Sequence, residues 1–242
     1  GEMLRGNMGV SYISGRDVFA TFVSKLPATL LLTVLAVLLT IVISVPLGIL
    51  AAVKQGRLAD QVLRFLSFIG NAMPNFFVAL LLMQLLSMKL GWLPVISDGT
   101  TIRSAIMPML TLAIAMSAKY MRQVRTAVLE ELNKEYVNGA MARGVSERVI
   151  LWKSVMRSAL LTIVTLLALS IGSLLGGTAI VESIFMWDGV GKLAVDAIQM
   201  RDYPLIQAYV VWMAIIYVVV NLITDLLYRV LDPKIRLGAE KE

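Results

Sequence analysis

The residues best suited to binding a partner lie in one charged stretch, 129–157, between two long apolar segments. From residue 135 it reads EYVNGAMARGVSERVILWKSVMR, with basic side chains set among small residues around Gly144. Small residues let a short helix approach another protein closely, and glycine can end that helix and turn the chain. The stretch therefore predicts a docking loop that carries its contacts on Glu135, Tyr136, Ala140, Ala142, Arg143, Gly144 and Ser146. The alternative is a solvated loop whose charges only set membrane topology.

The residue inventory argues against catalysis. The chain has no histidine and no cysteine, so it lacks the commonest general base, the commonest metal ligand and any thiol nucleophile. It also lacks the HExxH and GxSxG motifs and a P-loop. We therefore expect no catalytic residues, no metal site and no cofactor held by this chain. The basic residues cluster beside apolar segments, which favours a membrane orientation signal over nucleic-acid binding.

Composition and length predict a polytopic, all-α membrane protein. Hydrophobic residues make up 58% of the chain, against roughly 45–50% in soluble domains. A helix needs about 20 apolar residues to cross a bilayer. Five segments meet this length and should form a helical bundle: 27–53, 66–88, 104–128, 158–181 and 204–228.

The distribution of positive charge predicts the orientation of these spans. Fifteen of the 22 lysines and arginines lie in 54–64, 119–157 and 229–242, and the other seven lie in the alternate connections. Loops rich in lysine and arginine face the cytoplasm. The docking loop and the C-terminus should therefore be cytoplasmic, and the N-terminus should lie outside.

Two of the expected spans carry residues that could line a pathway. Met73 and Pro74, flanked by two asparagines, predict a bend at membrane depth, and glycines four apart in the fourth span allow close helix contact. Tight structural packing is the alternative for each. The candidate pathway and gate residues are Asn71, Met73, Pro74, Asn75, Gly172, Ser173, Gly176, Gly177 and Glu182.

The segment 182–203 combines aromatic, glycine and charged residues on the predicted outer side. Phe185 and Trp187 suit a membrane interface, where aromatic rings are enriched. Gly189 and Gly191 predict a turn before a short helix.

Several stretches, in this order, resemble the permease subunits of ABC importers in the dipeptide, oligopeptide and nickel family. They are GNMGVS at 6–11, LPATL at 26–30, MPNFFVALLL at 73–82, LGWLPV at 90–95, EYVNGAMARGVSER at 135–148, ESIFMWDGVGKLAVDAIQMRDYP at 182–204 and NLITDLLYRVLDPKIR at 221–236. The resemblance implies a type I importer fold with an extracytoplasmic segment at 1–26, a permease domain at 27–237 and a tail at 238–242. It also implies one further helix upstream of this sequence.

The resemblance further implies a set of partners in the inner membrane. They are a second homologous permease, two P-loop ATPases that bind ATP and Mg²⁺, and an extracytoplasmic substrate-binding protein. The substrate is expected to be nickel or another metal chelate, or else a small peptide. The short 96–103 connection favours nickel. A stand-alone ion-coupled transporter is the alternative function, although the chain shows no clear repeat pair or midplane acids.

Overall fold

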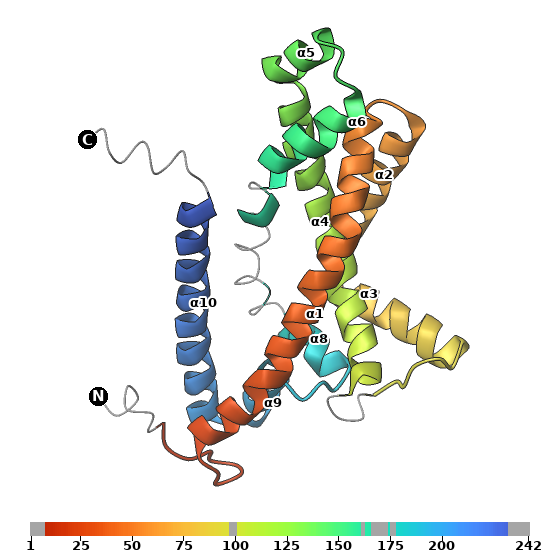
Figure 1. Ribbon diagram of the computed structural model, residues 1–242. Coiled ribbons are helices and arrows are strands. Elements are labelled where there is room, and N and C mark those ends of the chain that lie inside the picture. The colour runs from red at the N-terminus through yellow and green to blue at the C-terminus, as the bar shows by residue number, and fades with distance from the viewer. Residues whose placement is uncertain (1–7, 97–100, 161–162, 166–173, 175–177, 232–242) are drawn as a thin grey trace, which may run out of the picture. The chain divides into compact units, whose positions relative to one another are not determined.

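The computed structural model describes residues 8–96, 101–160, 163–165, 174 and 178–231 (Figure 1). Over these residues the chain forms helices joined by turns and short irregular segments, and the described part contains a single isolated antiparallel bridge, between Val10 and Asp17. The helices are α1 (Val18–Val53), α2 (Leu58–Ala72), α3 (Asn75–Leu82), η2 (Met83–Lys89), α4 (Ile102–Leu132), α5 (Glu135–Ala142), α6 (Glu147–Ile150), η3 (Leu151–Val155), α8 (Ala179–Ile184), α9 (Val190–Met200) and α10 (Tyr203–Leu231). The elements η2 and η3 are π-helical turns.

Three described helices are long and apolar enough to cross a membrane, namely α1, α4 and α10. The pair of α2 with α3 and η2 adds a fourth if the broken pair is counted as one span. The expected bend is confirmed, since the helix is interrupted at Met73 and Pro74. Most of the expected fourth span lies outside the described residues, so the five-span bundle stays a prediction.

The first helix starts earlier than the sequence analysis expected. The side chain of Asp17 accepts a hydrogen bond from the Ala20 N–H at 2.7 Å, which is the geometry of a helix N-cap. The helix therefore begins at Val18, and the expected boundary at residue 26 falls inside it. Thr21, Ser24 and Lys25 interrupt the apolar run inside this helix, so a span placed by apolar content alone began after them.

The described chain divides into two compact units, each with its own apolar contacts. The unit formed by 1–39, 73–113 and 171–220 contains α3, α8 and α9, with the first part of α1 and most of α10. Its buried clusters join α1, α9 and α10 through Val18, Phe22, Val190, Ala197 and Ala208.

The second unit is formed by 40–72, 114–170 and 221–242. Its core joins the last part of α1, the second half of α4 and the docking-loop helices α5 and α6. Val124, Val128, Val137 and Ile150 are buried together in this core. The docking loop is therefore packed onto long helices rather than extended into solvent.

Candidate functional site

The docking loop forms the short helix that the sequence predicted. The chain leaves α4 at Leu132 and begins α5 only three residues later, at Glu135. A carboxylate in the first turn is favourable at the positive end of a helix. Tyr136 lies against the end of α4, where its hydroxyl donates a hydrogen bond of 3.2 Å to Glu131 Oε2.

Gly144 ends α5 as predicted. The N–H of Gly144 donates to the Met141 carbonyl at 2.9 Å, and the N–H of Val145 donates to the Ala140 carbonyl at 3.1 Å. This pair of bonds is a Schellman motif, which requires a left-handed residue after the helix. Gly144 supplies it with a φ of 80°, and α6 then begins after Ser146.

The two faces of the docking loop differ in burial. Val137 of α5 and Ile150 of α6 are buried in the core, and Ala140 is half-buried against it. The other predicted contact residues are exposed: Glu135, Tyr136, Ala142, Arg143, Gly144 and Ser146. Met141, Val145, Val149 and Trp152 add exposed apolar surface, which the sequence analysis did not assign to the contact. The loop therefore presents an apolar and basic surface from a firmly packed base.

The predicted pathway residues around the bend do not share one helix. Asn71 lies in the last turn of α2, and Asn75 begins α3 after the extended residue Pro74. Both asparagines and Pro74 are exposed, while Met73 is half-buried. Gly172, Ser173, Gly176 and Gly177 lie outside the described residues.

Glu182, expected at a gate, is fully buried in the structure. Its Oε1 accepts a hydrogen bond from the Thr29 hydroxyl at 2.8 Å, and its Oε2 accepts one from the Lys192 N–H at 3.0 Å. Burial raises the pKa of the Glu182 carboxyl above its ordinary value, and these hydrogen bonds act in the opposite direction. Lys192 lies in the first turn of α9, so the carboxylate anchors the start of that helix to α1.

Phe185 and Trp187 of this segment are also buried, so their rings pack inside the protein. The Trp187 indole N–H donates to the Ala28 carbonyl of α1 at 3.0 Å, so the ring turns inward. The turn at Gly189 is confirmed, because α9 begins directly after it, but Gly191 lies inside the first turn of that helix and not before it. A Cβ at Gly189 would collide with Glu182 and Thr29, so the close packing here requires glycine. Thr29 was missed as a partner because no local signal relates α1 to a segment 153 residues away.

Residues 44–237 match the protein family described as "Binding-protein-dependent transport system inner membrane component". This chain belongs to that family.

Individual relatives match nearly the whole chain. The glutathione transport system permease protein GsiC of Salmonella choleraesuis (strain SC-B67) is 37% identical over 235 residues, covering 97% of this chain and 76% of the relative. The oligopeptide transport system permease protein AppB of Bacillus subtilis (strain 168) is 40% identical over 245 residues, covering 97% of this chain and 78% of the relative.

Solved structures support the fold. A chain of the MetNI methionine ABC transporter, in an inward-facing conformation, superposes with a TM-score of 0.70 at 17% identity, covering 87% of this chain and 96% of that one. An amino acid ABC transporter solved with histidines gives a TM-score of 0.66 at 22% identity, covering 89% and 94%. At these identities the likeness concerns the fold alone.

The family settles the general role of this chain. It is a multi-pass, inner-membrane permease subunit of a binding-protein-dependent ABC transporter, and it is not itself an ATPase. Membership implies ATPase and binding-protein partners, with ATP bound by the partner subunits. It also replaces the stand-alone ion-coupled transporter that the sequence analysis kept as an alternative.

Proposed function

We propose that this permease subunit forms part of the translocation pathway of an importer for short peptides, including glutathione-like tripeptides. The observation that carries this proposal is 37–40% identity, over nearly the whole chain, to permeases named for glutathione and oligopeptides. The expected preference for nickel rested on one short connection, and these relatives do not support it. A peptide substrate is therefore the better hypothesis.

The proposed assembly pairs this chain with a second homologous permease and two P-loop ATPases, and an extracytoplasmic binding protein delivers the substrate. The exposed surface of the docking loop supports the ATPase contact, because α5 is short, rigidly based and bordered by small residues. Five spans with an outside N-terminus and a cytoplasmic C-terminus fit this assembly, since they place the loop on the ATPase side.

The mechanism that follows is a rocking movement driven by the ATPases. ATP binding closes the ATPase pair, pushes α5 and opens the pathway outward, and hydrolysis restores the inward-open state. Asn71, Met73, Pro74 and Asn75 would line the pathway at the broken helix, together with the glycines of the fourth span. Glu182 would hold the segment 182–203 in place as part of an outer gate and would not face the substrate, because both of its carboxylate oxygens accept hydrogen bonds inside the protein.

Uptake into proteoliposomes tests this function. The chain is reconstituted with its partner permease, ATPases and binding protein, and ATP-dependent uptake of labelled glutathione, trialanine and Ni²⁺ is compared. We expect peptide uptake that needs both ATP and the binding protein, with no Ni²⁺ uptake. Uptake of Ni²⁺ but of neither peptide would overturn the substrate assignment.

A further inference from the structure

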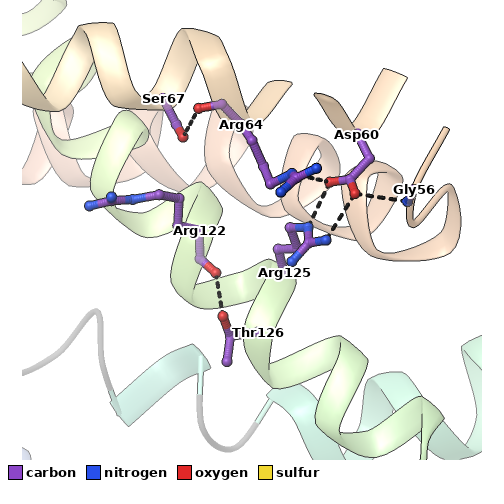
Figure 2. Close-up of polar contacts among 7 residues, drawn as sticks. All are labelled: Gly56, Asp60, Arg64, Ser67, Arg122, Arg125 and Thr126. Atoms are coloured by element: carbon purple, nitrogen blue, oxygen red, sulfur yellow. Dashed lines mark hydrogen bonds and ion pairs between the residues drawn. The ribbon is translucent and has the colours of Figure 1, made fainter. Parts of the chain in front are cut away.

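A carboxylate that no part of the proposed function uses lies buried in the first turn of α2. Asp60 has a fully buried side chain, and two arginines surround it (Figure 2). Arg125 of α4 donates a hydrogen bond to each carboxylate oxygen, from Nε to Oδ1 at 2.7 Å and from Nη2 to Oδ2 at 2.9 Å. The Gly56 N–H donates to Oδ2 at 3.0 Å, and Arg64, one turn further along α2, lies 3.3 Å from Oδ1.

This ion pair fixes geometry more than it adds stability. Removing a carboxylate and a guanidinium from water costs about as much as their attraction returns, so a buried pair is weak evidence for stability. Its two parallel bonds are strongly directional, because the planar guanidinium fits a carboxylate in one orientation. Arg125 therefore sets both the distance and the rotation of α4 relative to the start of α2.

Two glycines allow neighbouring helices to pack closely against α4, one on α1 and one on α2. A Cβ on Gly48 of α1 would lie 2.6 Å from Val124, and a Cβ on Gly70 of α2 would lie 2.8 Å from the Ala118 Cβ. The glycines let the helices approach but form no directional bond. Arg122 of α4 also lies over the Phe68 ring of α2, 5.3 Å from its centroid, but this cation–π contact fixes orientation less strictly than a two-bond ion pair. Asp60 and Arg125 thus supply the bidentate link between these two helices.

Arg125 lies on the helix that continues into the docking loop. Only Asn133 and Lys134 separate α4 from α5, and Val137 of α5 is buried in the same cluster as Val124 and Val128 of α4. A displacement of α5 must therefore move the end of α4. The guanidinium of Arg125 passes that movement to the first turn of α2.

We propose that Asp60 and Arg125 form a positioning pair that transmits movement of the docking loop to α2, and so to the broken helix beyond it. This inference rests on the proposed function, because it assumes that an ATPase displaces α5. The pair touches neither nucleotide nor substrate in this proposal. Its role is to keep α2 in register with α4 while the loop moves.

Arg64 provides a matched control within the same cluster. It contacts the same carboxylate, but it belongs to α2 itself and its side chain is 46% exposed, against 18% for Arg125. Loss of Arg64 removes a charge beside Asp60 without removing the link between helices. If the pair acted only through local electrostatics, loss of either arginine would have the same effect on transport. If it positions the helices, only loss of Arg125 should impair transport.

The experiment measures peptide imported per ATP hydrolysed in assembled complexes, using labelled glutathione and trialanine in proteoliposomes. The variants are Asp60→Asn, Arg125→Gln, their double variant, Arg125→Lys and Arg64→Gln. We expect Asp60→Asn and Arg125→Gln to hydrolyse ATP but import about tenfold less peptide per ATP, a typical size for coupling between sites. The double variant should be no worse than either single variant, since both remove one interaction. Arg64→Gln should retain the wild-type ratio.

Arg125→Lys keeps the positive charge but loses the planar guanidinium that donates two parallel bonds. It should therefore assemble and import an intermediate amount of peptide per ATP. It answers the question if the neutral variants fail to assemble. The inference is overturned if import per ATP is unchanged in any assembled variant of Asp60 or Arg125, or if Arg64→Gln lowers the ratio equally. Failure of the wild-type complex to import peptide would instead overturn the proposed function, so the two failures are distinguishable.

Discussion

The buried carboxylate of Glu182 shows how a single acid can order a segment. It accepts one hydrogen bond from the Thr29 hydroxyl of α1 and one from the Lys192 N–H in the first turn of α9. One side chain therefore bonds to donors on two helices. Ser183, its neighbour in α8, has a hydroxyl that is buried without a hydrogen-bond partner in the described structure. Burial of Glu182 is therefore offset by hydrogen bonds, whereas burial of the Ser183 hydroxyl costs free energy without such compensation.

Replacing Glu182 with alanine should destabilise the protein by about 2 kcal/mol, because the Thr29 hydroxyl and the Lys192 N–H would lose their buried acceptor. Ser183→Ala is the matched control and should leave stability unchanged or slightly higher. The thermal unfolding midpoint of each purified variant in detergent measures the difference. Equal midpoints for the two variants would contradict the anchoring role of Glu182.

At the scale of elements, α5 is defined by how it ends. Gly144 has a φ of 80°, and a Cβ built there would meet no atom within 4 Å. Any effect of a small side chain at this position must therefore come from the backbone conformation. Gly139, in the middle of the same helix, has ordinary helical geometry, and its nearest neighbour would lie 3.7 Å from a Cβ.

Gly144→Ala should impose about 1 kcal/mol of backbone strain and lower peptide uptake about fivefold, because the helix end that presents the docking surface is disturbed. Gly139→Ala should retain uptake, since alanine favours a helix interior. Uptake and ATP hydrolysis are measured side by side in proteoliposomes. Loss of uptake in Gly139→Ala alone would place the sensitive point within the helix instead of at its end.

At the scale of the whole molecule, charge distribution predicts the side on which each loop lies. The absence of cysteine from the sequence allows this to be tested with single introduced thiols. Ser14, before α1, and Ser154, in the docking loop, are both exposed and lie outside the proposed contact residues.

Ser14→Cys should react with a membrane-impermeant maleimide added to intact spheroplasts, because the N-terminal side is expected to lie outside. Ser154→Cys should react only after the membrane is permeabilised. Labelling is followed by a gel-mobility shift of the purified chain. The reverse pattern would invert the proposed orientation and remove the docking loop from the ATPase side.

The sequence by itself determined the family, the long apolar helices and the local backbone events. Gly144 and Pro74 could be assigned because glycine and proline restrict the backbone at their own positions, whatever lies around them. The tertiary structure alone decided which side chains meet. Asp60 and Arg125 are 65 residues apart, and Thr29 and Glu182 are 153 residues apart, so no local pattern could pair them. It also turned Trp187 and Glu182 inward, because burial depends on which helix packs over a segment and not on the segment itself.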